Sequence, residues 1–559
     1  MKKNSLSFKQ IFHLVILVCF AAFLFWISNP NILFNEGLSF FAFFIYLPVL
    51  IAVRKSPLKL VWLFGGLYGA LSYGFYGYWL KSFHPLWLII ACIGYFLICA
   101  LLFLVLKYAD LIAKKNGWII QFFCICAYEY LKTLGFFGIS YGVTAYTQWK
   151  NIYLIQICDI IGVFGLNLLV IFPSAFLFSL ITKKRAKNKL LNEADSEKHS
   201  HISAYVKKER ALSKTSLGFT YTLGVFWLVC ICASYIYGFS DIQKKQDSTF
   251  VTVAAIQNNE DPWKNGIEEY SNNVRNLIQL TEEAQSLSTE IDFVVWPETA
   301  VTPSIVYNYD YGTDLRRYML VSQLLNFIDE NNAVFVIGNS HEVDVHGAER
   351  ARYNSVLVFE PGKNVHPPQP EIYSKIKLVP FTEYFPAKYI FPWLYIKLLN
   401  GDMNMWEKGD EYTVFDYRGL KFSTPICFED TFDTICRLMV LNGSRCFINL
   451  SNDSWSKSVP CQMQHLAMAV FRCVENEVPG VRSTASGVTC SISPDGVIQK
   501  AASPFCSSFI ISKVPVLKGD SKTIFTTYGD IAAYLELAIA GLLLIIQTII
   551  VIIIKIKTN

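Results

Sequence analysis

Eight apolar stretches limit what this chain can fold into. A membrane-spanning helix needs ~20 mostly apolar residues, and each stretch comes close to that length or exceeds it. They run over residues 11–28, 37–53, 60–80, 85–106, 118–134, 152–181, 217–239 and 531–554. The pattern predicts a membrane domain with seven helices over 1–239, a polar domain over 240–530, and a last membrane helix with a short tail over 531–559.

Lysine and arginine cluster at alternate ends of these stretches. They precede the first stretch, follow the second, fourth and sixth, and end the chain, whereas the intervening short loops carry few. Because membrane proteins keep such residues on the cytoplasmic side, both termini are predicted to be cytoplasmic and the polar domain to lie outside. The net charge of +5 reflects this topology and does not indicate nucleic-acid binding. The first stretch could instead be a cleaved signal peptide, but no small-residue cleavage site follows it.

Neither a metal site nor a disulfide framework is expected. The insert 183–216 contains His199 and His201, and we interpret it as a solvated, partly disordered cytoplasmic loop. About half of the 15 cysteines lie in the apolar stretches, where cysteine acts as a small apolar residue. The others form no CxxC pair and no zinc spacing. Whether any of them pair stays open.

The segment 240–530 has the pattern of an α/β domain. Short apolar runs rich in β-branched residues alternate with amphipathic helical patterns. The predicted strands are 250–256, 293–296, 333–337, 355–359 and 446–450, and the predicted helices include 268–286, 315–330 and 464–477. The segment 385–406, which contains Trp393 and Trp406, breaks this alternation with many apolar side chains. Two interpretations stay open for it: a loop that covers the core, or an arm that faces the membrane and holds lipid.

Three polar residues of this domain are candidates for acyl-transfer chemistry. Cys427 could attack a carbonyl as a thiolate. Glu298, which follows the strand 293–296 and Pro297 at a predicted strand end, could accept the thiol proton if burial raises its pKa. Lys375 could stabilise both the thiolate and an oxyanion. Each signal is weak alone, because a single buried cysteine usually only packs in the core and an exposed lysine is usually a solvated charge.

The surrounding motifs resemble a known family. Segments 292–298, 373–384 and 425–430 resemble the three catalytic segments of the nitrilase superfamily. The pattern Tyr-x-Lys-x-x-Leu-Val-Pro-Phe-x-Glu-Tyr over 373–384 and Asn-Asp-Ser-Trp over 452–455 resemble its membrane branch, the apolipoprotein N-acyltransferase family. The resemblance covers nearly the whole chain. It implies a multi-pass α-helical membrane domain with about eight helices and a nitrilase-like four-layer α-β-β-α sandwich.

The resemblance also implies roles for individual residues. It assigns the base to Glu298, the lysine to Lys375 and the nucleophile to Cys427, and it leaves Lys377 without a catalytic role. Supporting positions fall on Glu383, Phe428 and Glu429, and a candidate substrate-binding position falls on Trp263. Trp393 and Trp406 are further candidates for substrate binding, because they belong to the aromatic segment 385–406. The chain departs from the family where Gly138-Ile-Ser-Tyr141 stands for Gly-Phe-Pro-Trp and Phe428 for tyrosine. These departures affect substrate detail and leave the reaction class unchanged.

The function implied by the resemblance is the last step of bacterial lipoprotein maturation. An acyl chain would pass from a membrane phospholipid to Cys427 as a thioester, and then to the α-amine of the S-diacylglyceryl-cysteine of an apolipoprotein. No cofactor, metal or nucleic acid is needed, and a monomer in the inner membrane with its catalytic domain on the periplasmic side suffices. One alternative is a membrane-anchored carbon-nitrogen hydrolase (an amidase or nitrilase) that uses water and a small substrate. A second alternative is a non-enzymatic membrane receptor or scaffold whose hydrolase-like domain has lost its catalytic activity.

Three further polar residues have structural interpretations. Glu129 and Lys132 lie one helical turn apart within an apolar stretch, where charges are costly, so we expect them to pair. Asp159 is expected near the membrane interface. His465 is more readily a satisfied helix histidine than a ligand or a second base.

Overall fold

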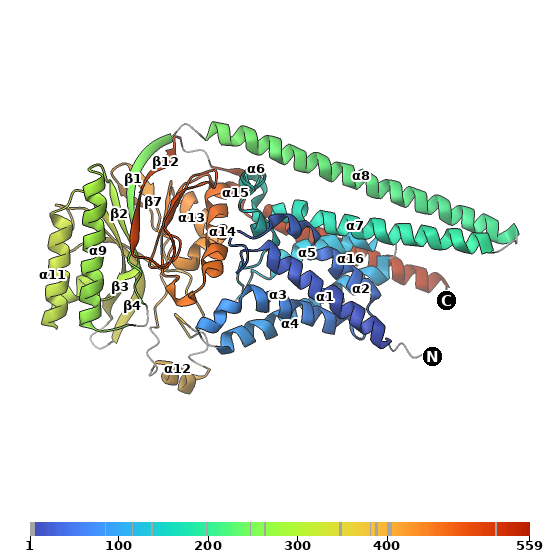
Figure 1. The fold of residues 1–559 in the computed structure, drawn as a ribbon, viewed down its shortest axis with the longest axis horizontal. Coiled ribbons are helices and arrows are strands. Elements are labelled where there is room, and N and C mark those ends of the chain that lie inside the picture. Colours follow the sequence, from blue (N-terminus) through green and yellow to red (C-terminus); the bar gives the residue numbers. More distant parts are fainter. Residues whose placement is uncertain are drawn as a thin grey trace. The chain divides into compact units, whose positions relative to one another are not determined.

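The chain divides into two compact units in the computed structural model (Figure 1). One comprises residues 1–240 and 530–559, and the other residues 241–529. The structure describes residues 6–83, 85–113, 116–135, 138–196, 200–245, 248–261, 264–312, 314–345, 349–380, 382–385, 390–399, 405–519 and 522–558.

The first unit is helical and carries the membrane-spanning segments of a multi-pass membrane protein. Among its described residues, five helices are long and apolar enough to cross a membrane. They are α1 (Phe8–Ser28), α4 (Pro85–Ala113), α7 (Cys158–Ser196), α8 (Ser200–Lys244) and α16 (Ile531–Thr558).

Three of the predicted spans form shorter elements. The second becomes a 3₁₀ helix, Ser39–Phe44, followed by α2 (Tyr46–Lys55), and the third and fifth become α3 (Val61–Tyr76) and α5 (Gly117–Leu131). Pro48 offers no N–H to the carbonyl four residues before it, so one regular α-helix cannot run through the second stretch. The count of eight membrane helices therefore stays a prediction.

The insert 183–216 is not the irregular loop that we predicted. Helices α7 and α8 continue through its residues 183–196 and 200–216, so the prediction of partial disorder is wrong for these residues. The segment is rich in Lys, Glu, Ala and Leu, which are good helix formers, and this propensity outweighs its polarity. His199 lies outside the described residues, as does the side chain of His201.

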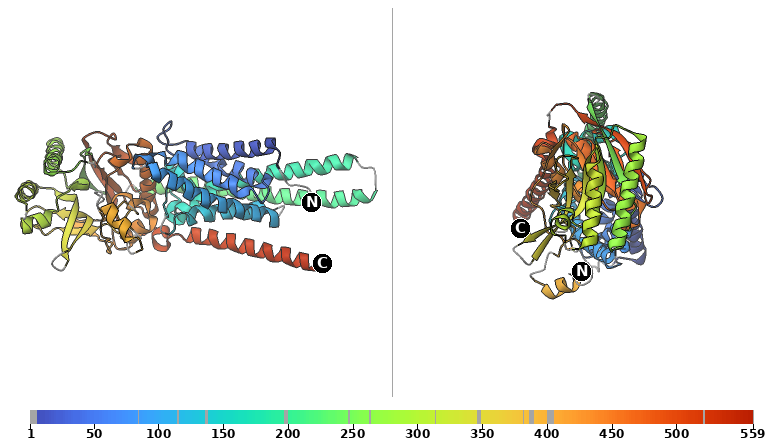
Figure 2. Two further views of the ribbon diagram at one scale, coloured as in Figure 1. Left: turned by 90° about the horizontal axis from the view of Figure 1, so that it is seen from below. Right: turned by 90° about the vertical axis from the view of Figure 1, so that its left-hand side faces the viewer.

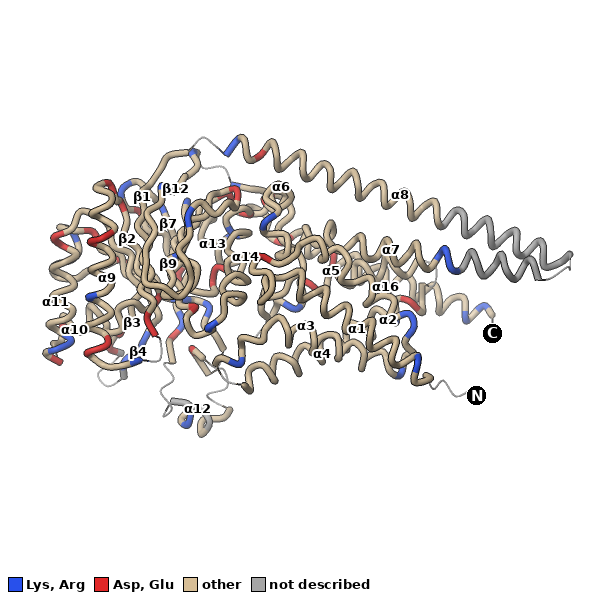
Figure 3. The backbone as a smooth tube through the Cα atoms, in the orientation of Figure 1, with Lys and Arg blue, Asp and Glu red and all other residues tan. Residues whose placement is uncertain are grey.

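Charges in the helical unit follow the expected pattern. Basic residues lie at the last turn of α2, on α7 at the start of the insert, and at the last turn of α16, toward one end of this unit (Figure 3). The predicted pair between Glu129 and Lys132 is confirmed, with 2.9 Å between Nζ and Oε2. Glu129 also accepts hydrogen bonds from Tyr46 and from the backbone N–H of Thr144. The side of the membrane on which the basic end lies stays a prediction.

The second unit has the predicted α/β architecture. A six-stranded sheet has the order β12-β1-β2-β3-β4-β5, and a four-stranded sheet has the order β11-β10-β9-β8. The strands of the first sheet are β1 (Ser248–Gln257), β2 (Phe293–Val301), β3 (Val334–Val345), β4 (Glu349–Phe359), β5 (Glu371–Ser374) and β12 (Ser508–Leu517). Those of the second are β8 (Phe447–Ser451), β9 (Gly480–Thr484), β10 (Cys490–Ile492) and β11 (Ile498–Ala501). All five predicted strands are present.

The sheets and helices of this unit form four layers. Helices α9 (Ile267–Leu287) and α11 (Leu315–Asp329) lie side by side over the outer face of the six-stranded sheet (Figure 2). The other face packs on the four-stranded sheet, beyond which lie α13 (Asp433–Leu441) and α14 (Val459–Asn476). Successive residues of β1 alternate between the two cores: Val253 and Ala255 lie between the sheets, and Ala254 and Ile256 lie under the helices. This arrangement is the predicted α-β-β-α sandwich.

Candidate active site

The candidate residues meet where neighbouring strands end. Strands β1, β2 and β3 are parallel, and the segment 423–426 runs parallel to β8 through isolated bridges. Lys375 directly follows β5, Cys427 directly follows the bridge at Ile426, and Asn452 directly follows β8. In α/β folds, functional groups gather at the carboxyl ends of the strands.

Glu298 lies inside β2 on an irregular part of the strand, and this corrects our prediction of a strand end. Regular pairing of β2 with β3 is interrupted between Trp296 and Val301, and Thr299 has left-handed backbone with a φ of +48°. Gly338 of β3 permits this geometry, because a Cβ there would lie 2.2 Å from the carbonyl oxygen of Pro297. The bulge re-aims the Glu298 side chain away from the ladder.

Two donors orient the Glu298 carboxylate. The backbone N–H of Asn452 donates to Oε2 at 2.8 Å, and the Asn354 amide donates to Oε1 at 2.8 Å. Oε1 also lies 3.2 Å from Nζ of Lys375. The carboxylate is thus held by groups from three different strands or strand ends.

Lys375 is buried between two carboxylates. Its Nζ lies 2.6 Å from Oε1 of Glu383 as well as 3.2 Å from Glu298, and it lies over the Phe428 ring, 5.3 Å from the centroid. Burial lowers the pKa of the lysine, but the charges of Glu298 and Glu383 outweigh this and raise the pKa well above its usual value. Lys375 is therefore a permanent cation in the site.

Cys427 begins the 3₁₀ helix η4 (Cys427–Thr431) with a φ of +53°, which is uncommon for a residue other than glycine. Its carbonyl accepts a hydrogen bond from the Asn449 amide at 2.9 Å. Burial raises the pKa of the buried thiol, the Glu298 charge raises it further, and the Lys375 ammonium opposes both. Such a thiol needs an adjacent base to become a nucleophile. The charges of Glu298 and Lys375 act on it most strongly, and the negative charge of Asp453 adds a smaller effect.

Glu429 ties the lysine segment to the nucleophile segment. Its carboxylate accepts four hydrogen bonds at 2.7–2.9 Å, from the backbone of Ile376, Lys377 and Ile426 and from the Tyr373 hydroxyl. Burial raises its pKa to about 7, and these donors oppose that shift. Lys377 takes part through its backbone, while its ammonium lies over the Phe432 ring, 5.0 Å from the centroid.

A polar pocket of about 210 Å³ opens beside Glu298. Its walls include Thr299 and Asn452, which adjoin the candidate base in space, and Trp406. The other lining residues are Glu260, Lys264, Asn265, Tyr270, Thr302, Pro303, Ser304, Arg317, Ser340, Glu342 and Arg352. Charged side chains of both signs line this space, so it fits a polar or zwitterionic group better than an acyl chain.

Comparisons with known proteins match both units. A family model described as Apolipoprotein N-acyltransferase N-terminal domain matches residues 21–176, and one described as Carbon-nitrogen hydrolase matches residues 252–516. Apolipoprotein N-acyltransferase 1 of Treponema denticola is 36% identical over 531 residues, which cover 92% of this chain and 93% of that protein. Its namesake in Treponema pallidum is 39% identical over 508 residues, 90% of each chain. The chain belongs to the apolipoprotein N-acyltransferase family.

A more distant member of the family also matches over most of its length. Apolipoprotein N-acyltransferase of Borreliella burgdorferi is 29% identical over 533 residues, which cover 92% of each chain. The resemblance that the motifs predict is thereby confirmed, and so is the combination of a helical N-terminal region with a nitrilase-like fold. The match to the Carbon-nitrogen hydrolase model includes Glu298, Lys375 and Cys427.

The residues predicted to bind substrate lie in different surroundings. Trp406 is half-buried, lines the pocket, and donates its backbone N–H to the carbonyl of Glu383 at 2.7 Å. Trp393 lies on α12 (Pro392–Leu399) and is 65% exposed. Its neighbours Ile390, Phe391 and Ile396 are also exposed. These four side chains therefore do not cover the core, whereas Phe385 at the start of the segment is buried, so both interpretations of 385–406 stay open. Trp263 lies outside the described residues.

Sequence reasoning missed two residues that hold the candidate base in this apolipoprotein N-acyltransferase fold. Asn354 lies on β4 and carries no motif, so nothing in the sequence links it to Glu298. Asn452 was part of a recognised motif, but its contribution is a backbone N–H, which no side-chain pattern can reveal. His465 is satisfied as predicted, by Asp430 and Asp453.

Proposed function

We propose that this protein N-acylates lipoproteins, using a phospholipid as acyl donor and the α-amine of an S-diacylglyceryl-cysteine as acceptor. The relatives that match over nine-tenths of the chain are named apolipoprotein N-acyltransferases. The observation that carries the mechanism is the placement of Lys375 between Glu298 and Glu383, with the charges of Glu298 and Lys375 acting on Cys427.

The first half-reaction forms a thioester. Glu298 takes the thiol proton of Cys427, and the sulfur attacks the carbonyl carbon of the phospholipid ester. Lys375 stabilises the thiolate and the oxyanion of the tetrahedral intermediate. The ester C–O bond then breaks, the proton on Glu298 passes to the departing alkoxide, and a lysophospholipid leaves.

The second half-reaction transfers the acyl chain. The neutral α-amine of the lipoprotein cysteine attacks the thioester carbonyl, and Glu298 takes the proton that the amine loses. An N–C bond forms and the C–S bond breaks, so the thiolate of Cys427 leaves and recovers its proton from Glu298. Membrane helices support this exchange because they keep two lipid substrates in one plane near the enzyme.

A carbon-nitrogen hydrolase would use the same residues and end with water. Several helices suited to spanning a membrane exceed what an anchor needs, and they favour a reaction between lipids. The exposed apolar side chains around α12 also fit a lipid substrate better than a small soluble amide.

Incubation of the purified protein with phospholipid and a synthetic diacylated lipopeptide tests the proposal. We expect the triacylated peptide and, without the peptide, an acyl group on Cys427 by mass spectrometry. Cys427→Ala should abolish both products. Cys446→Ala, which changes another buried cysteine of the same unit, is the matched control and should leave them intact. Release of free fatty acid at the same rate with and without the peptide would instead indicate a hydrolase.

A further inference from the structure

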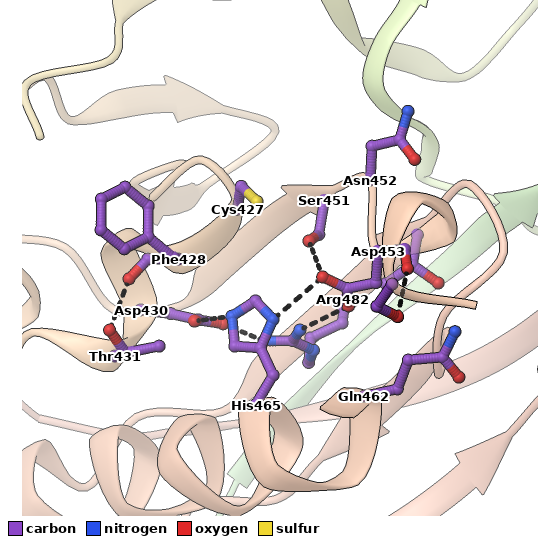
Figure 4. Close-up of polar contacts among 12 residues, drawn as sticks. Cys427, Phe428, Asp430, Thr431, Ser451, Asn452, Asp453, Gln462, His465 and Arg482 are labelled. Carbon is purple, nitrogen blue, oxygen red and sulfur yellow. Dashed lines mark hydrogen bonds and ion pairs between the residues drawn. The ribbon is translucent and has the colours of Figure 1, made fainter. Parts of the chain in front are cut away.

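His465 occupies a buried position between two carboxylates, those of Asp430 and Asp453 (Figure 4). Its Nε2 lies 2.7 Å from Oδ1 of Asp430, and its Nδ1 lies 3.1 Å from Oδ1 of Asp453. A neutral imidazole has only one N–H, so two carboxylate partners require the doubly protonated ring. Burial lowers the pKa of His465, but the Asp430 and Asp453 charges outweigh this and raise it to about 9.

Arg482 of β9 completes this cluster. Its guanidinium contacts Oδ2 of Asp430 and lies 3.8 Å from Oδ2 of Asp453. Two cations thus face two anions in a buried place, and the charges balance. The negative charge of Asp453 contributes to raising the pKa of the Cys427 and Cys461 thiols. The charge of Asp430 does the same for the thiols of Cys436 and Cys473.

The two carboxylates belong to the two segments that carry the reacting groups. Asp430 lies in η4, three residues after Cys427. Asp453 follows Asn452, whose backbone N–H donates to the Glu298 carboxylate. Asp453 also raises the pKa of Cys427, while the Ser451 hydroxyl, which donates to Asp453 at 3.2 Å, lowers it. His465 therefore joins the nucleophile segment to the base segment through two ion pairs.

We propose that His465 is a positioning residue for Cys427. It fixes the loop of the nucleophile against the loop that holds Glu298, and it balances the Asp453 charge that acts on the sulfur. This inference rests on the proposed function, in which Cys427 is the nucleophile. It assigns no proton transfer to the histidine, because its two ring nitrogens are occupied by the carboxylates of Asp430 and Asp453.

The rate of Cys427 alkylation by iodoacetamide against pH tests the proposal in the full-length protein. The modified peptide is quantified by mass spectrometry, because the chain has 15 cysteines. His465→Gln leaves Asp430 and Asp453 against Arg482 alone, so the thiolate becomes harder to form. We expect the pH midpoint to rise by about one unit and the rate at pH 8 to fall about tenfold. Acyl transfer should lose kcat with little change in KM.

A second substitution separates positioning from general damage. The double variant His465→Gln/Asp453→Asn leaves one positive charge, Arg482, against one negative charge, Asp430, so the cluster is again neutral. The rate of Cys427 alkylation should therefore recover toward that of the natural protein. Asn476→Ala removes a buried hydrogen-bonding group near the end of the same helix, and it should leave the alkylation profile unchanged. An unchanged midpoint in His465→Gln, or a double variant slower than the single one, would overturn the proposal.

The test remains decisive if His465→Gln does not fold. Asp453→Asn alone removes the negative charge that disfavours the thiolate, so alkylation at pH 7 should become faster, and a slower rate would overturn the proposal. Alkylation of Cys427 is measured whichever reaction the enzyme catalyses. Failure of this inference is thus distinguishable from failure of the acyl-transfer proposal, which the lipopeptide assay tests.

Discussion

At the scale of single residues, Lys375 has one carboxylate partner, Glu383, besides the candidate base Glu298. Glu383 contacts only Lys375 among the reacting candidates, and its second oxygen accepts the backbone N–H of Val379 at 2.7 Å. Burial raises the pKa of Glu383, while Lys375 lowers it. We infer that Glu383 keeps the ammonium of Lys375 in place while Glu298 is free to exchange protons.

The two neighbouring lysines should differ sharply in importance. Lys375→Ala leaves Glu298 and Glu383 as facing carboxylates without a cation, and we expect it to reduce acyl transfer at least about 10³-fold, the scale of a lost oxyanion stabiliser. Lys377→Ala removes a side chain that contacts the Phe432 ring, so activity should stay within a few-fold. Equal losses in steady-state assays of the two variants would contradict the assignment.

The His465 cluster makes stability depend on pH. The folded protein holds His465 with a pKa of about 9, above its ordinary value of 6.5. The protonated His465 therefore stabilises the folded state fully below pH 6.5, and this stabilisation is lost as the pH rises through 9. The shift corresponds to about 3 kcal/mol. The melting temperature should fall between pH 6.5 and 9, and His465→Gln should remove most of that fall. The same decline in both proteins would show that other groups cause it.

At the scale of elements, the site depends on an irregular strand. Gly338→Ala places a methyl group 2.2 Å from the Pro297 carbonyl oxygen, where neither strand can yield without moving Glu298. We expect a loss of acyl transfer of at least about tenfold together with a lower melting temperature. Gly218→Ala in α8, where a Cβ meets no atom within 4 Å, is the control and should leave activity unchanged.

The apolar side chains around α12 should matter for lipid use more than for folding. Trp393 is 65% exposed, so Trp393→Ala removes little packing. We expect the apparent KM for phospholipid in mixed micelles to rise several-fold while the melting temperature changes by less than ~1 °C. Leu315→Ala on α11, at 68% exposure, controls for loss of any exposed apolar side chain. Equal changes in both variants would contradict a specific role in lipid binding.

At the scale of the whole molecule, the chain combines a membrane unit with a catalytic unit inserted before the last helix. The proposed orientation places residues 241–529 on the periplasmic side of the bacterial inner membrane. Alkaline phosphatase, which is active only outside the cytoplasm, should be active when fused after residue 529 and inactive when fused after residue 559. The reverse pattern in intact cells would contradict the orientation inferred from Lys and Arg.

Local patterns in the sequence determined the two units, the five predicted strands and the family. Apolar length and period-two alternation report burial directly. Short motifs stay recognisable because the chemistry proposed for Glu298, Lys375 and Cys427 would need fixed residue types. The same patterns do not report helix continuity, so 183–216 was wrongly expected to be a loop. Membrane-helix lengths also depend on packing and on single residues such as Pro48.

Only the tertiary structure decided how the site is held. The Asn354 amide on Glu298, the four donors to Glu429 and the position of His465 between Asp430 and Asp453 all join residues far apart in the chain. A hydrogen bond or an ion pair depends on distances of about 3 Å, and the sequence specifies such distances only after the strands have paired and the layers have packed. For this reason the candidate reacting residues could be predicted from the chain alone, whereas the groups that orient them could not.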